Sequence, residues 1–270
     1  TKIYISNELG SDENKFGLRS SPYATFSKAL NDYFPNDTII VMEGTYTEDL
    51  ELNGDYYIIS EKGPQYTIIN LENNINRTIQ IYGSLELEGF TIKNTRGVTV
   101  NGDFSNNIIS IRKCIFINNT GGKGAAIFSN ALNGMLNISN CTFINNIPAA
   151  GGNGPIFLQN SNASIINNII WDNYPIEGLD TVNFNNIVKY NILKNESNWK
   201  QIDSTQGNIS DDPLFLNESE NNFNLTFYSP AIDAGDPSYP KDPDGTRADI
   251  GALYFDNRDN QPPTVAFTSN

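Results

Sequence analysis

The sequence repeats one short segment four times, as Gly89-Phe90-Thr91-Ile92-Lys93-Asn94, Cys114-Ile115-Phe116-Ile117-Asn118-Asn119, Cys141-Thr142-Phe143-Ile144-Asn145-Asn146 and Asn168-Ile169-Ile170-Trp171-Asp172-Asn173. The aromatic residues of these copies, Phe90, Phe116, Phe143 and Trp171, follow one another after 26, 27 and 28 residues. A second repeat relates Gly124-Ala125-Ala126-Ile127-Phe128 to Gly154-Pro155-Ile156-Phe157-Leu158. A period of this length, built from short strands and Asn or Gly turns, is typical of a solenoid whose coils pack on one another.

The other apolar segments have the length of strands. They cover residues 38–42, 57–60, 67–69, 78–81 and 85–87, and each is too short for a helix. A leucine-rich repeat has a similar period, but its Leu-x-x-Leu-x-Leu frame is missing here. The sequence therefore predicts a parallel β-helix.

Asparagine is unusually frequent, with 41 residues in the chain. Stacked coils place equivalent turn residues above one another, and Asn tolerates left-handed turns while its amide can bond the amide of the next coil. The clearest expected rungs pair Asn118 with Asn145 and Asn119 with Asn146. We interpret these residues as an internal ladder and not as ligand-binding groups.

The charge balance excludes several classes of function. Lys and Arg number 17 and Asp and Glu number 31, so the formal charge is −14 and the pI is near 4.3. Such a surface does not suit nucleic acid, and the absence of histidine removes imidazole catalysis. The chain has no apolar run of about 18 residues, so we expect no membrane insertion in this segment.

One helix is expected, over residues 22–34. Pro22 and Thr25 open a segment with apolar residues at helical spacing, namely Phe26, Ala29, Leu30 and Tyr33. Residues 1–6 before it have the pattern of a strand.

Three parts of the sequence resemble a known family. The opening contains Ile3-Tyr4-Ile5-Ser6, Gly10-Ser11-Asp12 and Ser21-Pro22-Tyr23-Ala24-Thr25-Phe26, and the generic repeats follow it. The end contains Asp211-Asp212-Pro213-Leu214-Phe215, Ser229-Pro230-Ala231-Ile232-Asp233-Ala234-Gly235-Asp236 and Asp242-Pro243-Asp244-Gly245-Thr246-Arg247-Ala248-Asp249-Ile250-Gly251-Ala252. Together they resemble secreted right-handed parallel β-helix proteins of the pectate-lyase-like superfamily, with the terminal motif of surface proteins labelled choice-of-anchor domains. That family contains lyases, hydrolases and adhesins, so the resemblance specifies no activity.

The resemblance and the repeats together predict an all-β domain over residues 1–256. We expect a right-handed parallel β-helix of about seven coils, with the 22–34 helix capping the first coil and an irregular cap, residues 211–256, covering the last. Residues 257–270 are polar and Pro-rich and then resemble the first strand of an immunoglobulin-like or fibronectin-like module. We therefore expect a larger modular protein that is extracellular or on the cell surface, with a signal peptide outside this sequence.

A uronate lyase site would need an exposed Lys or Arg as Brønsted base beside acidic residues. Arg112 and Lys113 precede Cys114 in an expected strand, and Lys123 lies in the glycine loop 121–124. Arg112 and Lys123 are the candidate catalytic residues. No cluster of three Asp or Glu accompanies them on neighbouring coils, so a solvated face is the simpler interpretation.

A sugar-binding platform is a second candidate. Asp172, Asp180 and Glu177 lie near Trp171 and Tyr174 in the sequence, and such aromatic rings can stack on sugars. The same residues would supply the two carboxylates that a glycoside hydrolase needs, although no Asp or Glu recurs at coil spacing. Because Trp171 takes the aromatic position of the repeat, we expect it in the core.

The acidic end of the chain is a candidate calcium site. Asp242, Asp244 and Asp249, with Asp233 and Asp236, supply the hard oxygen ligands that Ca²⁺ prefers, and Gly245 permits a sharp turn. The alternative is that these carboxylates cap turns by accepting backbone N–H groups.

We expect a non-catalytic interaction domain. Its partner would be a polysaccharide or cell-surface glycan, or a protein in a surface assembly. A polysaccharide-degrading enzyme, lyase first, and a structural subunit of a filament or surface layer remain alternatives. Cys114 and Cys141 should stack on adjacent coils as buried thiols, because parallel side chains on one sheet do not favour the torsion of a disulfide.

Overall fold

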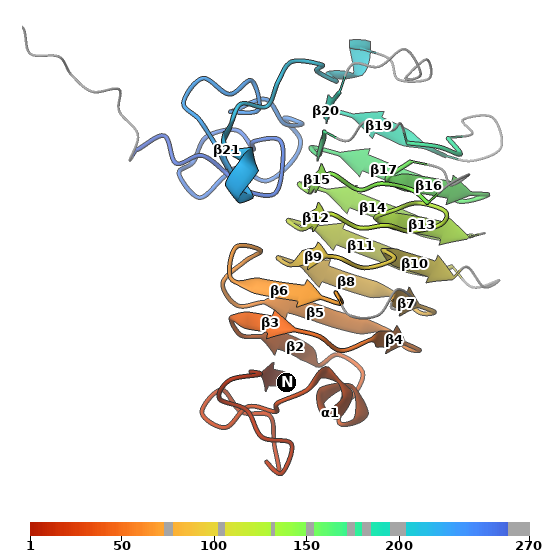
Figure 1. Cartoon of the computed structure of the whole chain (residues 1–270), viewed down its shortest axis with the longest axis vertical. Helices are drawn as coiled ribbons and strands as arrows, with labels where there is room; N and C mark the ends of the chain where they lie inside the picture. The colour runs from red at the N-terminus through yellow and green to blue at the C-terminus, as the bar shows by residue number, and fades with distance from the viewer. Residues whose placement is uncertain are drawn as a thin grey trace, which may run out of the picture.

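The computed structural model is a parallel β-helix, which confirms the predicted fold class (Figure 1). It describes residues 1–72, 78–101, 106–130, 133–149, 154–171, 176–179, 185–194 and 204–258. Over these residues, three parallel sheets run the length of the solenoid. A short antiparallel pair lies beside them.

The first sheet has eight strands in order along the axis: β1 (Lys2–Ile5), β2 (Thr38–Val41), β5 (Tyr56–Ser60), β8 (Leu85–Glu88), β11 (Ile108–Arg112), β14 (Met135–Ser139), β17 (Ala163–Ile166) and β19 (Ile187–Lys189). The second has seven: β3 (Gly44–Tyr46), β6 (Thr67–Asn70), β9 (Thr91–Lys93), β12 (Ile115–Ile117), β15 (Thr142–Ile144), β18 (Ile169–Ile170) and β20 (Ile192–Leu193). The third has five: β4 (Leu50–Leu52), β7 (Ile79–Ile81), β10 (Val98–Asn101), β13 (Ile127–Asn130) and β16 (Ile156–Gln159).

The solenoid has about five coils and not the seven that we expected. Within the described residues, five coils place a strand in all three sheets, from β2–β3–β4 to β14–β15–β16. Among the described residues, the coils of β17–β18 and β19–β20 have strands in two sheets, and Glu177 of the former makes an isolated parallel bridge to Phe157 of β16. The spacing of the sequence repeats could not predict the number of complete coils, because it does not show how many strands each repeat forms.

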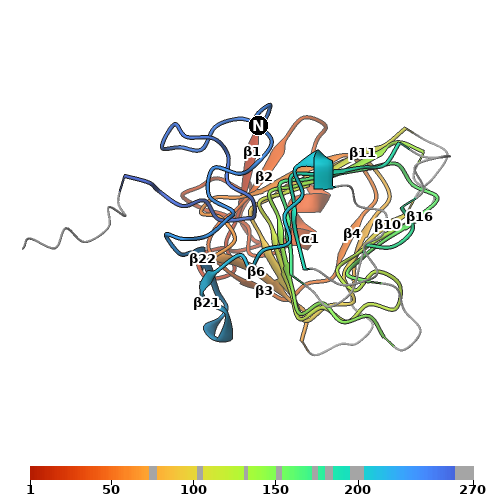
Figure 2. The same cartoon turned by 90° about the horizontal axis from the view of Figure 1, so that it is seen from above.

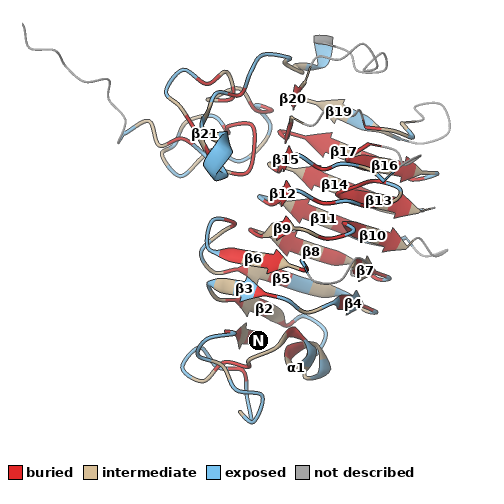
Figure 3. Ribbon diagram, in the orientation of Figure 1, coloured by how far each residue is buried: buried red, intermediate tan, exposed pale blue. Residues whose placement is uncertain are grey.

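The coils bury one face of each strand in a continuous core (Figure 3). Phe116 and Phe143 pair in register and stack with ring centroids 4.8 Å apart. However, Phe116 also pairs with Ile92 and not with Phe90, and Phe143 pairs with Ile170. The expected core position of Trp171 is therefore wrong. Ile170 takes that position, and Trp171 lies one residue further, half-buried on the outer side.

Asparagine ladders run through the turns, as predicted. Asn119 and Asn146 are buried, and the Nδ2 of Asn119 donates to the Oδ1 of Asn146 at 2.8 Å. Asn118 and Asn145 both have a φ of 55°, in the left-handed region. A second buried ladder links Asn168 to Asn191 at 3.0 Å.

The two cysteines continue this second ladder toward the N-terminus. The backbone N–H of Cys141 donates to the Oδ1 of Asn168 at 2.8 Å. Cys114 and Cys141 are buried free thiols, as predicted, and their Sγ atoms lie 3.3 Å from the carbonyl oxygens of Arg112 and Ser139 respectively. Burial raises the pKa of the Cys141 thiol well above its usual value.

The helix α1 (Phe26–Asn31) packs against β1 at the N-terminal end. It is shorter than the expected 22–34 because Thr25 is the N-cap. The Oγ1 of Thr25 accepts the backbone N–H of Lys28 at 3.1 Å, which starts the helix there. Phe26 and Ala29 are the buried residues of the helix.

The chain after the solenoid forms η1 (Ser204–Gln206), β21 (Phe215–Asn217), η2 (Glu218–Glu220) and β22 (Asn222–Leu225). The cap, residues 211–256, contacts Ile169 and Ile192 near the last coils. It also extends sideways over Ile115, Ile117 and Ile144 on the outer face of the seven-stranded sheet, which we had not expected. Figure 2 shows it outside the stacked coils, on the side away from β10 and β16.

The linker and the module expected after it stay a prediction, because residues 259–270 lie outside the described residues. In the described part of the chain, no helix is long and apolar enough to cross a membrane.

Candidate functional site

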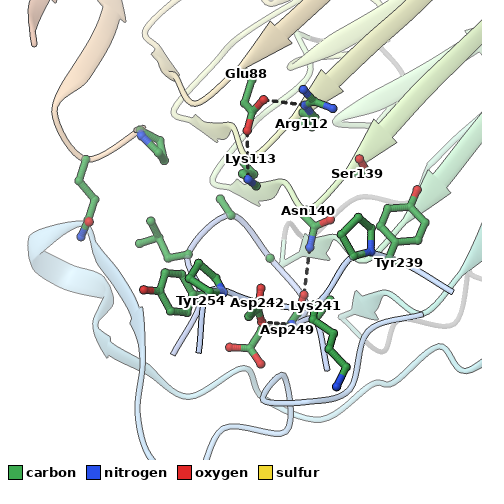
Figure 4. A pocket seen from close by; sticks show the side chains of 18 of the residues that line it. Glu88, Arg112, Lys113, Ser139, Asn140, Tyr239, Lys241, Asp242, Asp249 and Tyr254 are labelled. Atoms are coloured by element: carbon green, nitrogen blue, oxygen red, sulfur yellow. Dashed lines mark hydrogen bonds and ion pairs between the residues drawn. The ribbon is translucent and has the colours of Figure 1, made fainter. Parts of the chain in front are cut away.

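A cavity of about 650 Å³ lies between the solenoid and the cap, and we call it the cap groove. One wall comes from the turns that connect the eight-stranded and seven-stranded sheets. The other comes from residues 239–254 of the cap (Figure 4). Its chemically distinctive lining residues are Lys62, Gln65, Glu88, Arg112, Lys113, Asn140, Asn224, Tyr239, Lys241, Asp242, Asp249, Leu253 and Tyr254.

The solenoid wall carries two cations held by one carboxylate. The Nε of Arg112 donates to the Oε2 of Glu88 at 2.7 Å, and the Nζ of Lys113 lies 3.0 Å from its Oε1. Arg112 also pairs with Glu86. Burial would raise the pKa of Glu88, but the hydrogen bonds and charges of Lys113 and Arg112 outweigh it and lower that pKa. Glu88 is therefore ionised at neutral pH.

The backbone conformation sets the direction of this wall. Lys113 has a φ of 51°, and the equivalent residues of the next two coils, Asn140 and Asn167, have values of 49° and 59°. These three residues therefore occupy equivalent left-handed turn positions, which favour Asn over Lys. Lys113 occupies it with a long cationic side chain that is 59% exposed at the edge of the groove.

The cap wall is aromatic and polar. Tyr239 and Tyr254 line it together with Lys241 and Asp242, and Tyr254 is 43% exposed. Burial raises the pKa of Tyr239, so this phenol remains a hydrogen-bond donor at neutral pH. Figure 4 shows the two tyrosines on either side of the cavity, with Tyr239 beside Ser139 and Asn140.

Asp249 anchors the cap wall. Its Oδ1 accepts the backbone N–H of Asp233 and its Oδ2 accepts that of Phe255, each at 2.7 Å. Its own carbonyl accepts the Nδ2 of Asn140 at 3.0 Å, which ties the cap to the solenoid. Burial raises the pKa of Asp249 to about 7, although the two N–H donors act in the opposite direction.

The other calcium candidates also cap turns. The Oδ2 of Asp242 accepts the backbone N–H of Asp249 at 2.7 Å, and burial raises its pKa. The Oδ1 of Asp244 accepts the N–H and hydroxyl of Thr246, and these bonds lower its pKa to about 2. Across the described ranges, no three side chains of Asp, Glu, Cys or His come together in a way that would hold a metal ion. The carboxylates thus occupy the capping role that we considered as the alternative.

A second cavity of about 530 Å³ continues from the first, and we call it the side compartment. The two share Pro64, Gln65, Leu253 and Asn224 in their linings. The side compartment lies over the outer face of the seven-stranded sheet, where Ile115 and Ile117 are buried beneath the cap. The two cavities are therefore neighbours, and two of the residues that they share bond each other, since the Nε2 of Gln65 donates to the Oδ1 of Asn224 at 3.4 Å.

A comparison with models of known protein families finds no match to this chain, and a comparison with curated protein sequences finds none either.

The structure separates the two candidate lyase residues. Arg112 lines the cap groove, whereas Lys123 lies beside the five-stranded sheet. The Nζ of Lys123 donates to the Oε1 of Gln159 at 3.2 Å and lies 5.7 Å from the ring centroid of Phe128. The two cations therefore do not share one site.

The candidate sugar platform is also divided. Trp171 packs beside Phe215 of the cap, and the Nζ of Lys194 lies 5.7 Å from its ring centroid. Glu177 forms a bridge with Phe157 of the five-stranded sheet instead. Asp172, Tyr174 and Asp180 lie outside the described residues.

Sequence reasoning missed Tyr239 and Tyr254, because the cap has no repeat that relates it to the solenoid. One signal was present. Ile115, Phe116 and Ile117 are consecutive apolar residues, and all three are buried. A strand that is apolar on both faces indicates that something covers its outer side.

Proposed function

We propose that this chain is an extracellular β-helix domain that binds a glycan in the cap groove. The observation that carries the proposal is that Tyr239 and Tyr254 line one cavity with Arg112 and Lys113, two cations that Glu88 holds in ion pairs. The extracellular location rests on the resemblance of the two ends of the sequence to secreted β-helix proteins.

The groove has the chemistry that a sugar requires. Tyrosine offers an apolar ring face and a hydroxyl, which suits the apolar and polar sides of a pyranose. Gln65, Asn140 and Asn224 add amide donors and acceptors around the same cavity. Its volume of about 650 Å³ falls in the range of small-ligand sites.

The groove wall is also held in place before a ligand arrives. Glu88 fixes Arg112 and Lys113 through ion pairs, and the strands beneath them are hydrogen-bonded on both sides. A ligand therefore loses little affinity to the ordering of these side chains. Binding is favoured over uronate elimination because Arg112, the candidate base in this groove, is held in ion pairs with Glu86 and Glu88.

A glycan array with matched variants tests the proposal. Lys113→Asn restores the residue type of the next two coils, and Tyr254→Ala removes an exposed ring. Each should weaken binding of the best array ligand by about tenfold, as expected for loss of one good contact. Tyr82→Ala is the control, because Tyr82 is 39% exposed but bonds Gln80 outside the groove.

Two results would contradict the proposal. One is equal loss of binding in the Tyr82→Ala control. The other is the release of unsaturated uronates, measured by their absorbance, which would assign the chain to the lyases.

A further inference from the structure

We infer that the side compartment recognises an acetamido sugar, so that the groove binds an oligosaccharide containing N-acetylated units. The inference rests on the proposed function and specifies the ligand of the same groove. The two cavities share Gln65, Asn224 and Leu253, so neighbouring units of one oligosaccharide would lie in neighbouring cavities. The compartments differ in chemistry, and that difference identifies the ligand.

The side compartment is electrically balanced. Glu72 and Lys93 are the charged residues in its lining, and their charges cancel. The cap groove, in contrast, carries Lys62, Arg112, Lys113 and Lys241 against Glu88, Asp242 and Asp249. A neutral sugar unit therefore fits the side compartment better than a uronate does.

Apolar and amide groups lie together in the side compartment. Ile68 and Leu253 are half-buried and supply apolar surface, while Ile117 and Phe223, at 2% and 4% exposed, close the cavity behind them. Asn118, Asn222 and Asn224 supply amides in the same cavity. The Oδ1 of Asn222 already accepts the Nδ2 of Asn224 at 2.6 Å, which orients that pair.

An acetamido group matches both features at once. Its methyl group needs an apolar contact, while its N–H and C=O need an acceptor and a donor such as an asparagine amide provides. A sugar with only hydroxyl groups would set polar atoms against the apolar surface, at a cost in free energy. A free amine would add a charge to a compartment whose two charges already balance.

Asn118 allows a clean variant. Its φ of 55° is left-handed, so Asn118→Gly removes the amide without backbone strain. Asn160 has a φ of 51°, is exposed and lies outside both linings, so Asn160→Gly is the matched control.

Calorimetric titration of the whole chain with three tetrasaccharides tests the inference. The probes are β-1,4-linked tetra-N-acetylglucosamine, its fully deacetylated form and cellotetraose. We expect the acetylated probe to bind at least about tenfold more tightly than the other two, because they lack the acetamido group that the apolar surface and the Asn118 amide would contact. Asn118→Gly should remove most of that preference, and Asn160→Gly should keep it.

The opposite results overturn the inference. If cellotetraose binds as tightly as the acetylated probe, or if Asn118→Gly keeps the full preference, the acetamido assignment is wrong while glycan binding in the groove stands. If none of the three probes binds, the assignment is equally wrong, and the glycan array decides the proposed function separately.

Discussion

Lys113 and Glu88 form an ion pair between neighbouring coils, with 3.0 Å between Nζ and Oε1. Arg112 lies beside Glu88 in strand register and donates to its other oxygen at 2.7 Å. One carboxylate on β8 therefore positions two cations on the edge of the cap groove. Glu88 therefore both joins neighbouring coils and fixes the cations that line the groove.

Glu88→Gln should lower the free energy of unfolding at pH 7 by about 1 kcal/mol, since Arg112 and Lys113 are partly exposed and solvent screens the pairs. The pKa of Glu88 is lowered from 4.5, so its contribution is present above that value and is lost as the pH falls below it. Urea denaturation at pH 7 and pH 3 measures both effects. A difference between wild type and variant that is as large at pH 3 as at pH 7 would refute this role.

Asp249 should give the opposite pH dependence. Its pKa is raised from 3.8 to about 7 by burial, so the folded state binds the proton more tightly than the unfolded state. The stability from this group is complete below about pH 4 and is lost as the pH rises toward 7. Asp249→Asn does not titrate, so the stability advantage of wild type over the variant should shrink between pH 4 and pH 7. An advantage that grows with pH would show that the two N–H donors outweigh burial.

Calcium removal should leave the cap intact. Asp244, Asp242 and Asp249 accept backbone N–H groups, so EDTA should not change the melting temperature. Asp244→Ala should lower the melting temperature equally with calcium and with EDTA, because the lost bonds are those to Thr246. A melting temperature that rises with calcium in wild type and not in Asp244→Ala would restore the calcium site.

The cysteines should act as small apolar residues of the core. Replacing Cys114 and Cys141 by Ala should lower the free energy of unfolding by about 1–2 kcal/mol in total, because it leaves cavities between packed coils. A reductant should leave the wild-type melting temperature unchanged, since both residues are free thiols. A fall in that temperature on reduction would mean that the two sulfurs are bonded.

The periodic part of the fold was predictable because its physical cause is repetitive. Phe116 and Phe143 stack at the spacing of 27 residues that the sequence shows, and Asn119 and Asn146 bond where their alignment places them. Each coil must satisfy the same left-handed turn and fill the same core position. Residues of one type therefore recur at those positions.

The predicted alignment of the coils was wrong where one coil differs in length from the next. Phe116 pairs with Ile92, which lies 24 residues earlier, so aligning it with Phe90 shifted that coil by two residues. The same kind of error placed Trp171 in the core, although Ile170 pairs with Phe143. Aromatic identity is a weak guide to register because Ile and Phe fill the same core position.

The groove could not be predicted from local patterns. Tyr254 lies far from Lys113 in the sequence, and only the sideways packing of the cap brings them to one cavity. Ile115, Phe116 and Ile117 indicated that the outer face of their strand is covered. They did not indicate which segment covers it, because apolar packing has little directionality.

The proposed function requires a glycan to bind between the solenoid and the cap. A crystal structure of the protein soaked with its best array ligand would locate that glycan. We expect sugar density between Lys113 and Tyr254, with at least one ring against a tyrosine of the cap. Density on the five-stranded sheet beside Phe128 and Lys123, with an empty cap groove, would contradict it.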